Sequence, residues 1–90
     1  MRRRVHRTDE TQKPIVNGLR DCGFQVKIIG RPCDLLVRHR ATGKLTLLEV
    51  DGITKHRKRD MAQLEFIQDW EVPLVSNLDE ALMALGTRIL

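Results

Sequence analysis

Two strand-like segments joined by a very short turn constrain the fold of this chain more than any other feature. Residues 33–40 and 45–50 are rich in leucine and valine, and the Ala41-Thr42-Gly43 stretch between them has the composition of a turn. Because so short a connection leaves no room for a crossover, the two segments are expected to pair as an antiparallel hairpin. A one-residue slip would turn one strand's side chains to the other face, so the register decides which residues meet.

The segments around the hairpin extend it to a mixed four-stranded sheet flanked by helices, which is an α/β fold. Residues 24–28 alternate apolar and polar side chains, as a strand does. A helical segment separates the third strand from a short fourth strand, which predicts a parallel, right-handed crossover. The expected elements are a helix from residue 9 or 11 to residue 20, strands at 24–28, 33–40 and 45–50, a helix at 60–70, a strand at 72–75 and a last helix that opens at 76–79.

Local signals indicate where the helices begin and which faces they bury. Asp9 and Gln12 have the spacing of a capping box, but Pro14 favours a start near Thr11, because proline is best tolerated in the first turn. Asp60 is the expected cap of the second helix. The side chains at helical spacing that we expect on the buried face of that helix are Gln63, Leu64, Ile67 and Trp70.

Length and composition predict one small domain. The 90 residues are expected to form a single domain, 1–90, with a basic arm at 1–7. No apolar run approaches the ~20 residues that a membrane span needs, and no apolar segment follows the charged N-terminus as in a signal peptide. The two cysteines, Cys22 and Cys33, have neither metal-ligand spacing nor a disulfide framework, which favours a reducing, cytoplasmic setting.

Basic side chains are gathered in clusters along the chain, whose net charge is +4. Such clusters suit a polyanion, because each phosphate contact releases condensed counter-ions; the alternative is a solvated surface without a partner. Aromatic residues make up only 3%, so a base-stacking platform is not expected. The clusters are Arg2, Arg3, Arg4 and Arg7; Arg31, Arg38, Arg40 and Lys44; and Lys55, His56, Arg57, Lys58 and Arg59.

Two acidic residues are expected to meet across the hairpin. Tight closure of the turn places Asp34 directly opposite Glu49, on the same face of the sheet. Opposed Cβ atoms lie ~4.5–5.5 Å apart, where two like charges destabilise a sheet unless a cation offsets them. Oxygen ligands at that separation suit Mg²⁺ or Mn²⁺. The alternative is that both acids are solvated at strand ends and pair with Arg31 or Arg38.

The residues around these acids resemble a known nuclease core. Gly30-Arg31-Pro32-Cys33-Asp34-Leu35-Leu36-Val37, followed by Leu47-Leu48-Glu49-Val50, is similar to the "G-x-P-D-l-l-v … l-E-v-K" core of VRR-NUC domains, a branch of the PD-(D/E)XK nuclease superfamily. The likeness extends to Asp9-Glu10-Thr11-Gln12, to Gln63 and to residues 75–81, and covers about residues 7–86. The resemblance implies a restriction-endonuclease-like αβββαβ core, Mg²⁺ or Mn²⁺ as the cofactor without a small-molecule cofactor, DNA as the partner, and a homodimer.

The same resemblance implies roles for individual residues. For Gln63 the alternative is a hydrogen-bonded helix residue without a functional role. The matching residues are Asp34 and Glu49 for the metal-binding acids, the carbonyl of Val50 for the backbone ligand, Glu10 or Gln12 for the polar residue that the first helix offers to the metal or its waters, and Gln63 for the glutamine that the second helix points at the site.

The chain departs from the family pattern at two positions. Asp51 stands where the motif has its lysine, and it adds a possible metal ligand but no positive charge. Lys55 or Lys58, in the basic loop that follows, is the candidate replacement; otherwise catalysis is weakened or lost. Cys33 lengthens the step from proline to aspartate by one residue, which predicts a local bulge, and its thiol is expected to be packed rather than reactive.

The expected function is that of a metal-dependent endonuclease that hydrolyses phosphodiester bonds in duplex or branched DNA, in the cytoplasm of a bacterial or phage-infected cell. One alternative is a catalytically impaired DNA-binding module on the same fold. Another is a structural or protein-interaction domain in which the basic clusters are only surface. Under the leading hypothesis the residues expected to contact DNA are Arg2, Arg3, Arg4, Arg7, Arg31, Lys55, Arg57, Lys58 and Arg59.

Overall fold

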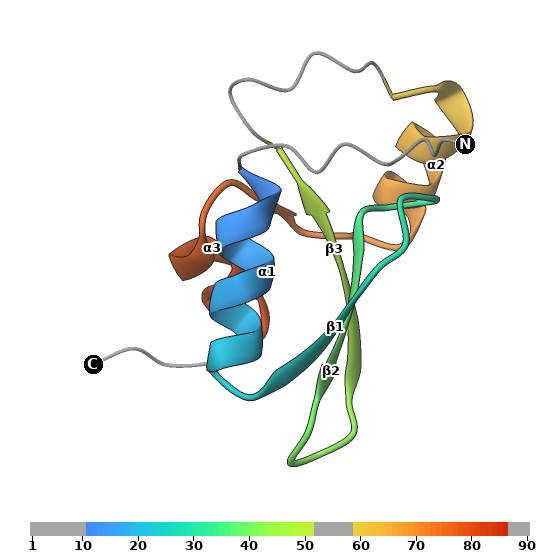
Figure 1. Cartoon of the computed structure of the whole chain (residues 1–90). Coiled ribbons are helices and arrows are strands. Elements are labelled where there is room, and N and C mark those ends of the chain that lie inside the picture. The colour runs from blue at the N-terminus through green and yellow to red at the C-terminus, as the bar shows by residue number, and fades with distance from the viewer. Residues whose placement is uncertain (1–10, 52–58, 87–90) are drawn as a thin grey trace, which may run out of the picture.

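The computed structural model describes residues 11–51 and 59–86, which form an α/β fold with a mixed four-stranded sheet and three helices (Figure 1). Within those residues no helix combines the length and the hydrophobicity that crossing a membrane requires. The elements follow the predicted order and are α1 Gln12–Asp21, β1 Phe24–Ile28, β2 Leu35–His39, β3 Leu45–Val50, α2 Met61–Asp69, β4 Leu74–Val75 and α3 Leu78–Ala84.

The strands lie side by side in the order β1-β2-β3-β4. The first three are antiparallel, because their connections are short, and β4 is parallel to β3, because the chain returns through α2. The predicted mixed sheet is therefore confirmed, with β3 in its interior.

The hairpin of β2 and β3 has the predicted register. Leu35 lies opposite Leu48, and Arg38 lies opposite Leu45. Strand β2 begins at Leu35 rather than at Cys33, because the chain is still bending at residues 31–34. The extra cysteine therefore lies before the strand and leaves the pairing unchanged.

The bend before β2 closes on the end of β1. The amides of Ile29 and Gly30 both donate to the carbonyl of Asp34, at 2.9 and 3.3 Å. The Ile29 contact continues the regular register of β1 and β2, and the Gly30 contact closes the turn that follows, where Gly30 has a positive φ of 81°. The bulge expected at Cys33 is therefore absent from the pairing of β1 and β2, because Cys33 lies in the bend between the two strands.

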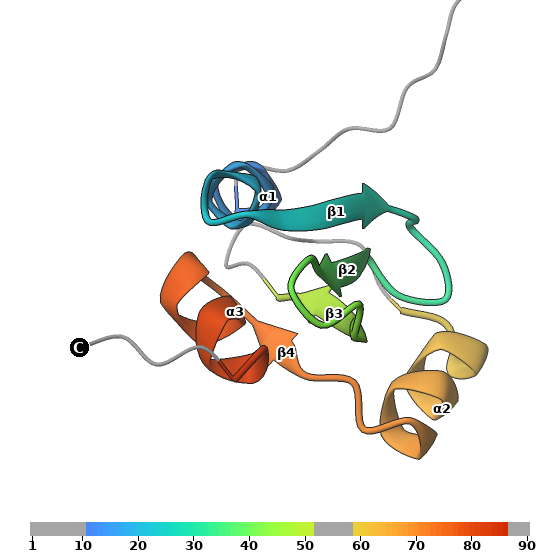
Figure 2. The same ribbon diagram turned by 90° about the horizontal axis from the view of Figure 1, so that it is seen from below.

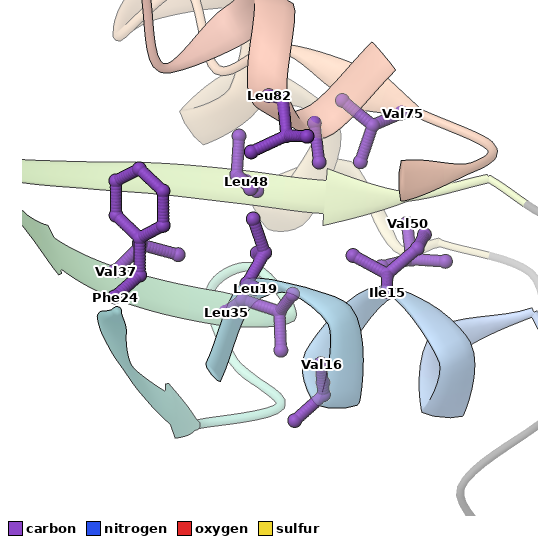
Figure 3. Packing of buried hydrophobic residues seen from close by; sticks show 11 residues of the cluster. Ile15, Val16, Leu19, Phe24, Leu35, Val37, Leu48, Val50, Val75 and Leu82 are labelled. Carbon is purple, nitrogen blue, oxygen red and sulfur yellow. The ribbon is translucent and has the colours of Figure 1, made fainter. Parts of the chain in front are cut away.

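The hydrophobic core lies between the sheet and the pair α1 and α3, which lie next to each other on one face (Figure 2). Helix α1 begins after Thr11, as Pro14 predicted, and ends at Asp21; Gly23, two residues further on, has a φ of 96° that suits a residue without Cβ. Alternate residues of the strands face these helices. The core side chains drawn in Figure 3 include Ile15, Val16, Leu19, Phe24, Leu35, Val37, Leu48, Val50, Val75 and Leu82.

The predicted buried face of α2 is wrong for most of its members. Of that face only Gln63 is buried, whereas Leu64 is 47% exposed and Trp70 is 69% exposed. Helix α2 lies on the side of the sheet away from α1 and α3 and makes few contacts with other elements (Figure 2). Helical spacing identifies an apolar face but does not show what that face packs against. On α2 the rings of Phe66 and Trp70 stack on each other, with centroids 5.8 Å apart.

Candidate functional site

The hairpin register brings two acidic residues together at the end of the sheet remote from the turn. The pairing ends at Leu35 and Leu48, and the next residues are Asp34, directly before β2, and Glu49; the Asp34 amide donates to Glu49 Oε1, so the two residues predicted to meet are in contact. Both side chains are buried: Asp34 is 4% exposed and Glu49 is 0% exposed. The alternative that these acids are solvated at strand ends is therefore wrong.

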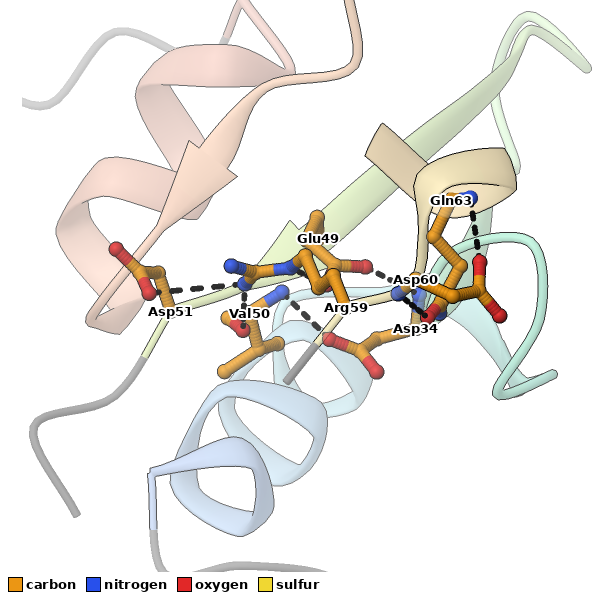
Figure 4. Close-up of polar contacts among 7 residues, drawn as sticks. All are labelled: Asp34, Glu49, Val50, Asp51, Arg59, Asp60 and Gln63. Atoms are coloured by element: carbon orange, nitrogen blue, oxygen red, sulfur yellow. Dashed lines mark hydrogen bonds and ion pairs between the residues drawn. The ribbon is translucent and has the colours of Figure 1, made fainter. Parts of the chain in front are cut away.

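Each of the two carboxylates is hydrogen-bonded to the backbone of the other strand (Figure 4). The Asp34 amide donates to Glu49 Oε1 at 3.1 Å, and the Val50 amide donates to Asp34 Oδ2 at 2.8 Å. An amide donor fixes the orientation of the carboxylate that accepts its hydrogen bond. The two contacts therefore link the strands at the point where the ordinary pairing of β2 and β3 ends.

A third charged side chain completes this group, and it comes from outside the hairpin. Arg59 Nε donates to Glu49 Oε2 at 2.5 Å, and its Nη2 donates to the Val50 carbonyl at 3.3 Å. The same Nη2 lies 3.6 Å from Asp51 Oδ1 (Figure 4). We call Asp34, Glu49, Val50, Asp51 and Arg59 the acid site.

Electrostatics favours the charged form of Arg59. Burial alone would lower the pKa of its guanidinium, but the hydrogen bond and the negative charge of Glu49, together with Asp51, raise that pKa above its ordinary value. Because Glu49 is fully buried, its carboxylate would be costly without a cation beside it. Arg59 therefore offsets a charge that the fold places inside the protein.

The oxygens of the acid site fit a hard divalent cation. A carboxylate of Glu49, the carbonyl of Val50 and a carboxylate of Asp51 already converge on one positive group, the Arg59 guanidinium. Carboxylate and carbonyl oxygens are the donors that Mg²⁺ and Mn²⁺ prefer. In residues 11–51 and 59–86, however, no three His, Cys, Asp or Glu side chains are grouped closely enough to hold a metal by themselves.

Gln63 lies close to the acid site but is used by the helix that carries it. Its backbone amide donates to Asp60 Oδ1 at 2.9 Å, and its side-chain Oε1 accepts from the Asp60 amide at 3.3 Å. These two bonds are a capping box, which confirms Asp60 as the cap of α2. The alternative interpretation of Gln63, a hydrogen-bonded helix residue, thus has a concrete structural basis, and its contact with a metal site stays a prediction.

Arg31 ties the bend before β2 to the start of α2. Its Nη2 lies 2.7 Å from Asp60 Oδ2, and both side chains are more than half exposed. The hydrogen bond from Arg31, and then that from the Gln63 amide, lower the pKa of the Asp60 carboxyl. This pairing holds the residue next to Arg59 near the hairpin.

The sequence predicted Arg59 as a contact to DNA and missed its place among the acids. No periodicity or spacing links it to Glu49, ten residues away, because the intervening loop has no regular pattern. A usable signal was its position directly before Asp60, since a helix cap holds the preceding residue close to the packed helix end.

The remaining predicted residues differ in what the structure says of them. Gln12 is buried at the start of α1, and Asp51 is exposed at the end of β3. Cys33 is fully buried; burial, and then the charges of Glu49 and Asp34, raise the pKa of its thiol to about 11, so it is packed as predicted. The predicted residues that lie outside the described residues are Arg2, Arg3, Arg4, Arg7, Glu10, Lys55, Arg57 and Lys58.

In comparisons with known protein families, with curated proteins and with solved structures, nothing matched this chain.

Proposed function

We propose that this protein is a metal-dependent DNA nuclease with a restriction-endonuclease-like core, of the VRR-NUC type that its hairpin residues resemble. The observation that carries the proposal is the acid site. Asp34, directly before β2, and Glu49 on β3 are both buried, and their carboxylates accept hydrogen bonds from the Val50 and Asp34 amides. Two buried acids side by side are costly for stability even when hydrogen-bonded, and a functional role accounts for their presence.

The residues that would hold Mg²⁺ or Mn²⁺ are Asp34, Glu49 and the carbonyl of Val50, with Asp51 as a further oxygen donor and Glu10 as the contribution of the N-terminal segment. The chemistry that such an ion supplies when bound is polarisation of the scissile phosphate and a lowered pKa for the attacking water. The interstrand hydrogen bonds of Asp34 and Glu49 keep their carboxylates from rotating. These two carboxylates are therefore already oriented for binding a cation.

The basic residues of the chain have two proposed roles. Lys55 or Lys58 is the proposed replacement for the lysine of the motif, and the basic clusters are the proposed DNA contacts. A homodimer would present two acid sites to the two strands of duplex or branched DNA.

The test is cleavage of duplex and branched DNA with Mn²⁺ or Mg²⁺ by wild type and by Glu49→Gln. A charged metal ligand supplies several kcal/mol of transition-state stabilisation, so we expect cleavage to fall by at least about a hundredfold. DNA affinity, measured by fluorescence anisotropy in EDTA, should stay within about twofold, since Glu49 is buried.

Glu65→Gln is the matched control, because it removes the same charge from an exposed position on α2. It should cleave DNA as wild type does. Cleavage by Glu49→Gln at the wild-type rate would refute the catalytic assignment. Glu49→Ala is a harsher version of the test, since it also leaves a cavity beside the core.

A second candidate function is a DNA-binding module that has lost catalysis. Asp51 stands where a lysine is expected, and Arg59 already neutralises Glu49. Calorimetric titration with Mn²⁺ separates the two functions: a nuclease binds the ion at the acid site and loses this binding in Glu49→Gln, whereas the module binds DNA but no ion at that site.

A further inference from the structure

We infer that Arg59 is an exchangeable counter-ion of the acid site, which a divalent metal ion must displace in order to bind. The inference rests on the proposed function and adds a mechanism that sets the metal affinity of the same site. It assigns Arg59 a role in the metal-free protein that neither the sequence motif nor its position in the basic loop indicates.

The contacts of Arg59 coincide with the proposed metal ligands. Its guanidinium reaches Glu49 Oε2 at 2.5 Å and the Val50 carbonyl at 3.3 Å, and these are two of the oxygens that the motif assigns to the ion. Asp51 Oδ1, at 3.6 Å, is the third oxygen on the same guanidinium (Figure 4). One positive group therefore occupies the meeting point of the donor set.

A divalent ion and the guanidinium compete for the same position. An ion that bound both Glu49 Oε2 and the Val50 carbonyl would enter the space beside these two oxygens that the Arg59 guanidinium now fills. Like charges brought together in a partly buried site also repel strongly. We therefore infer that an ion bound to both oxygens moves the Arg59 guanidinium away from its present position between them.

The protein needs such a counter-ion because Glu49 is completely buried. A buried carboxylate without a cation beside it is costly for stability. Arg59 supplies the positive charge next to Glu49 while no metal is bound. The Arg59 side chain is itself 19% exposed, so it reaches solvent and has a path out of the site.

The local backbone supports exchange of the side chain without movement of the helix. Arg59 directly precedes Asp60, which caps α2 and pairs with Arg31. The cap and this ion pair hold the backbone after Arg59. Displacement of the guanidinium therefore requires rotation of one side chain and leaves the capping box in place.

The experiment compares wild type with Arg59→Gln and Arg31→Gln by calorimetric titration with Mn²⁺ and by thermal melting in EDTA. Arg31→Gln is the matched control, because it removes one arginine charge near the site from a residue whose ion pair is with Asp60 rather than with Glu49 or Asp51. In wild type, metal binding has to break the charge-assisted hydrogen bond between Arg59 and Glu49, and Arg59→Gln lacks this bond. We therefore expect Arg59→Gln to bind Mn²⁺ at least about tenfold more tightly than wild type.

For Arg31→Gln we expect less than about a threefold change in Mn²⁺ affinity, since its ion pair is exposed. In EDTA, Arg59→Gln should melt at a lower temperature than wild type, and Mn²⁺ should raise its melting temperature by more than it raises that of wild type. If wild type binds Mn²⁺ clearly and Arg59→Gln binds it equally or more weakly, the inference is overturned while the proposed metal site stands.

Absence of Mn²⁺ binding in both proteins would instead defeat the proposed function, and the inference with it. If Arg59→Gln does not fold in EDTA, the same calorimetric titration with Mn²⁺ is made with Arg59→Lys. Lysine keeps the charge but cannot form the fork of contacts to Glu49 and Val50. Tighter Mn²⁺ binding than in wild type supports the exchange, and unchanged affinity contradicts it.

Discussion

At the scale of single residues, burial decides the chemistry of the two cysteines. Cys22 is exposed after α1, whereas Cys33 is fully buried beside the acid site. Burial first, and then the negative charges of Glu49 and Asp34, raise the pKa of the Cys33 thiol to about 11. Because the thiolate is the reactive form, this cysteine is protonated and inert at neutral pH.

We predict that iodoacetamide modifies one thiol per chain rapidly at pH 8, and the second only when guanidinium unfolds the protein. Cys22→Ser should remove the fast reaction. Mass spectrometry of timed samples measures both. Equal rates for the two thiols in the folded protein would contradict the burial of Cys33.

The same pKa shift has a consequence for stability. The folded pKa of Cys33, about 11, lies above its reference value of 9.0, so the unfolded chain releases the proton first. The contribution to stability is therefore fully present below pH 9 and is lost as the pH rises toward 11.

At the scale of elements, the contact between α1 and α3 depends on the absence of a side chain. A Cβ built on Gly18 would lie 2.5 Å from one Cδ atom of Leu78 and 2.9 Å from the other. Glycine within a helix is otherwise unfavourable by about 1 kcal/mol relative to alanine. The close approach of the two helices accounts for glycine at this position.

We predict that Gly18→Ala destabilises the protein by about 1 kcal/mol, because the overlap with Leu78 outweighs the gain in helix propensity. In a Leu78→Ala background, the same Gly18→Ala change should stabilise the protein by about 0.5–1 kcal/mol. Urea unfolding of the four proteins measures the coupling. The same sign of effect in both backgrounds would show that the two residues do not meet.

At the scale of the whole molecule, the property that bears on DNA binding is the charge of the chain. Its net charge is +4, and the basic residues are clustered in sequence. Clusters of this kind bind DNA through phosphates, and the release of counter-ions makes such binding dependent on salt. Salt dependence therefore tests DNA binding independently of catalysis.

We predict that the affinity for duplex DNA falls steeply with salt. About four phosphate contacts give a slope of about −3.6 in a plot of log K against log salt, or roughly a 150-fold loss between 50 and 200 mM. Fluorescence anisotropy in EDTA measures the slope. Binding that is absent or insensitive to salt would favour the structural or protein-interaction alternative.

Sequence by itself determined the element order, the mixed sheet and the hairpin register. These follow from short-range physics: the turn at residues 41–43 is too short for any pairing but an antiparallel one, and alternation sets the face of each strand. For that reason the meeting of Asp34 with Glu49 could be predicted from the sequence. The position of Asp60 as a helix cap is local in the same sense.

Only the tertiary structure decided which cation meets Glu49 and which helix faces are covered. The contact of Arg59 with Glu49 joins residues ten positions apart with no periodic sequence pattern between them, and the exposure of Trp70 depends on whether another surface lies against α2. Spacing along a chain specifies which side chains share a face. It carries no information on what that face packs against, because that is set by contacts between distant segments.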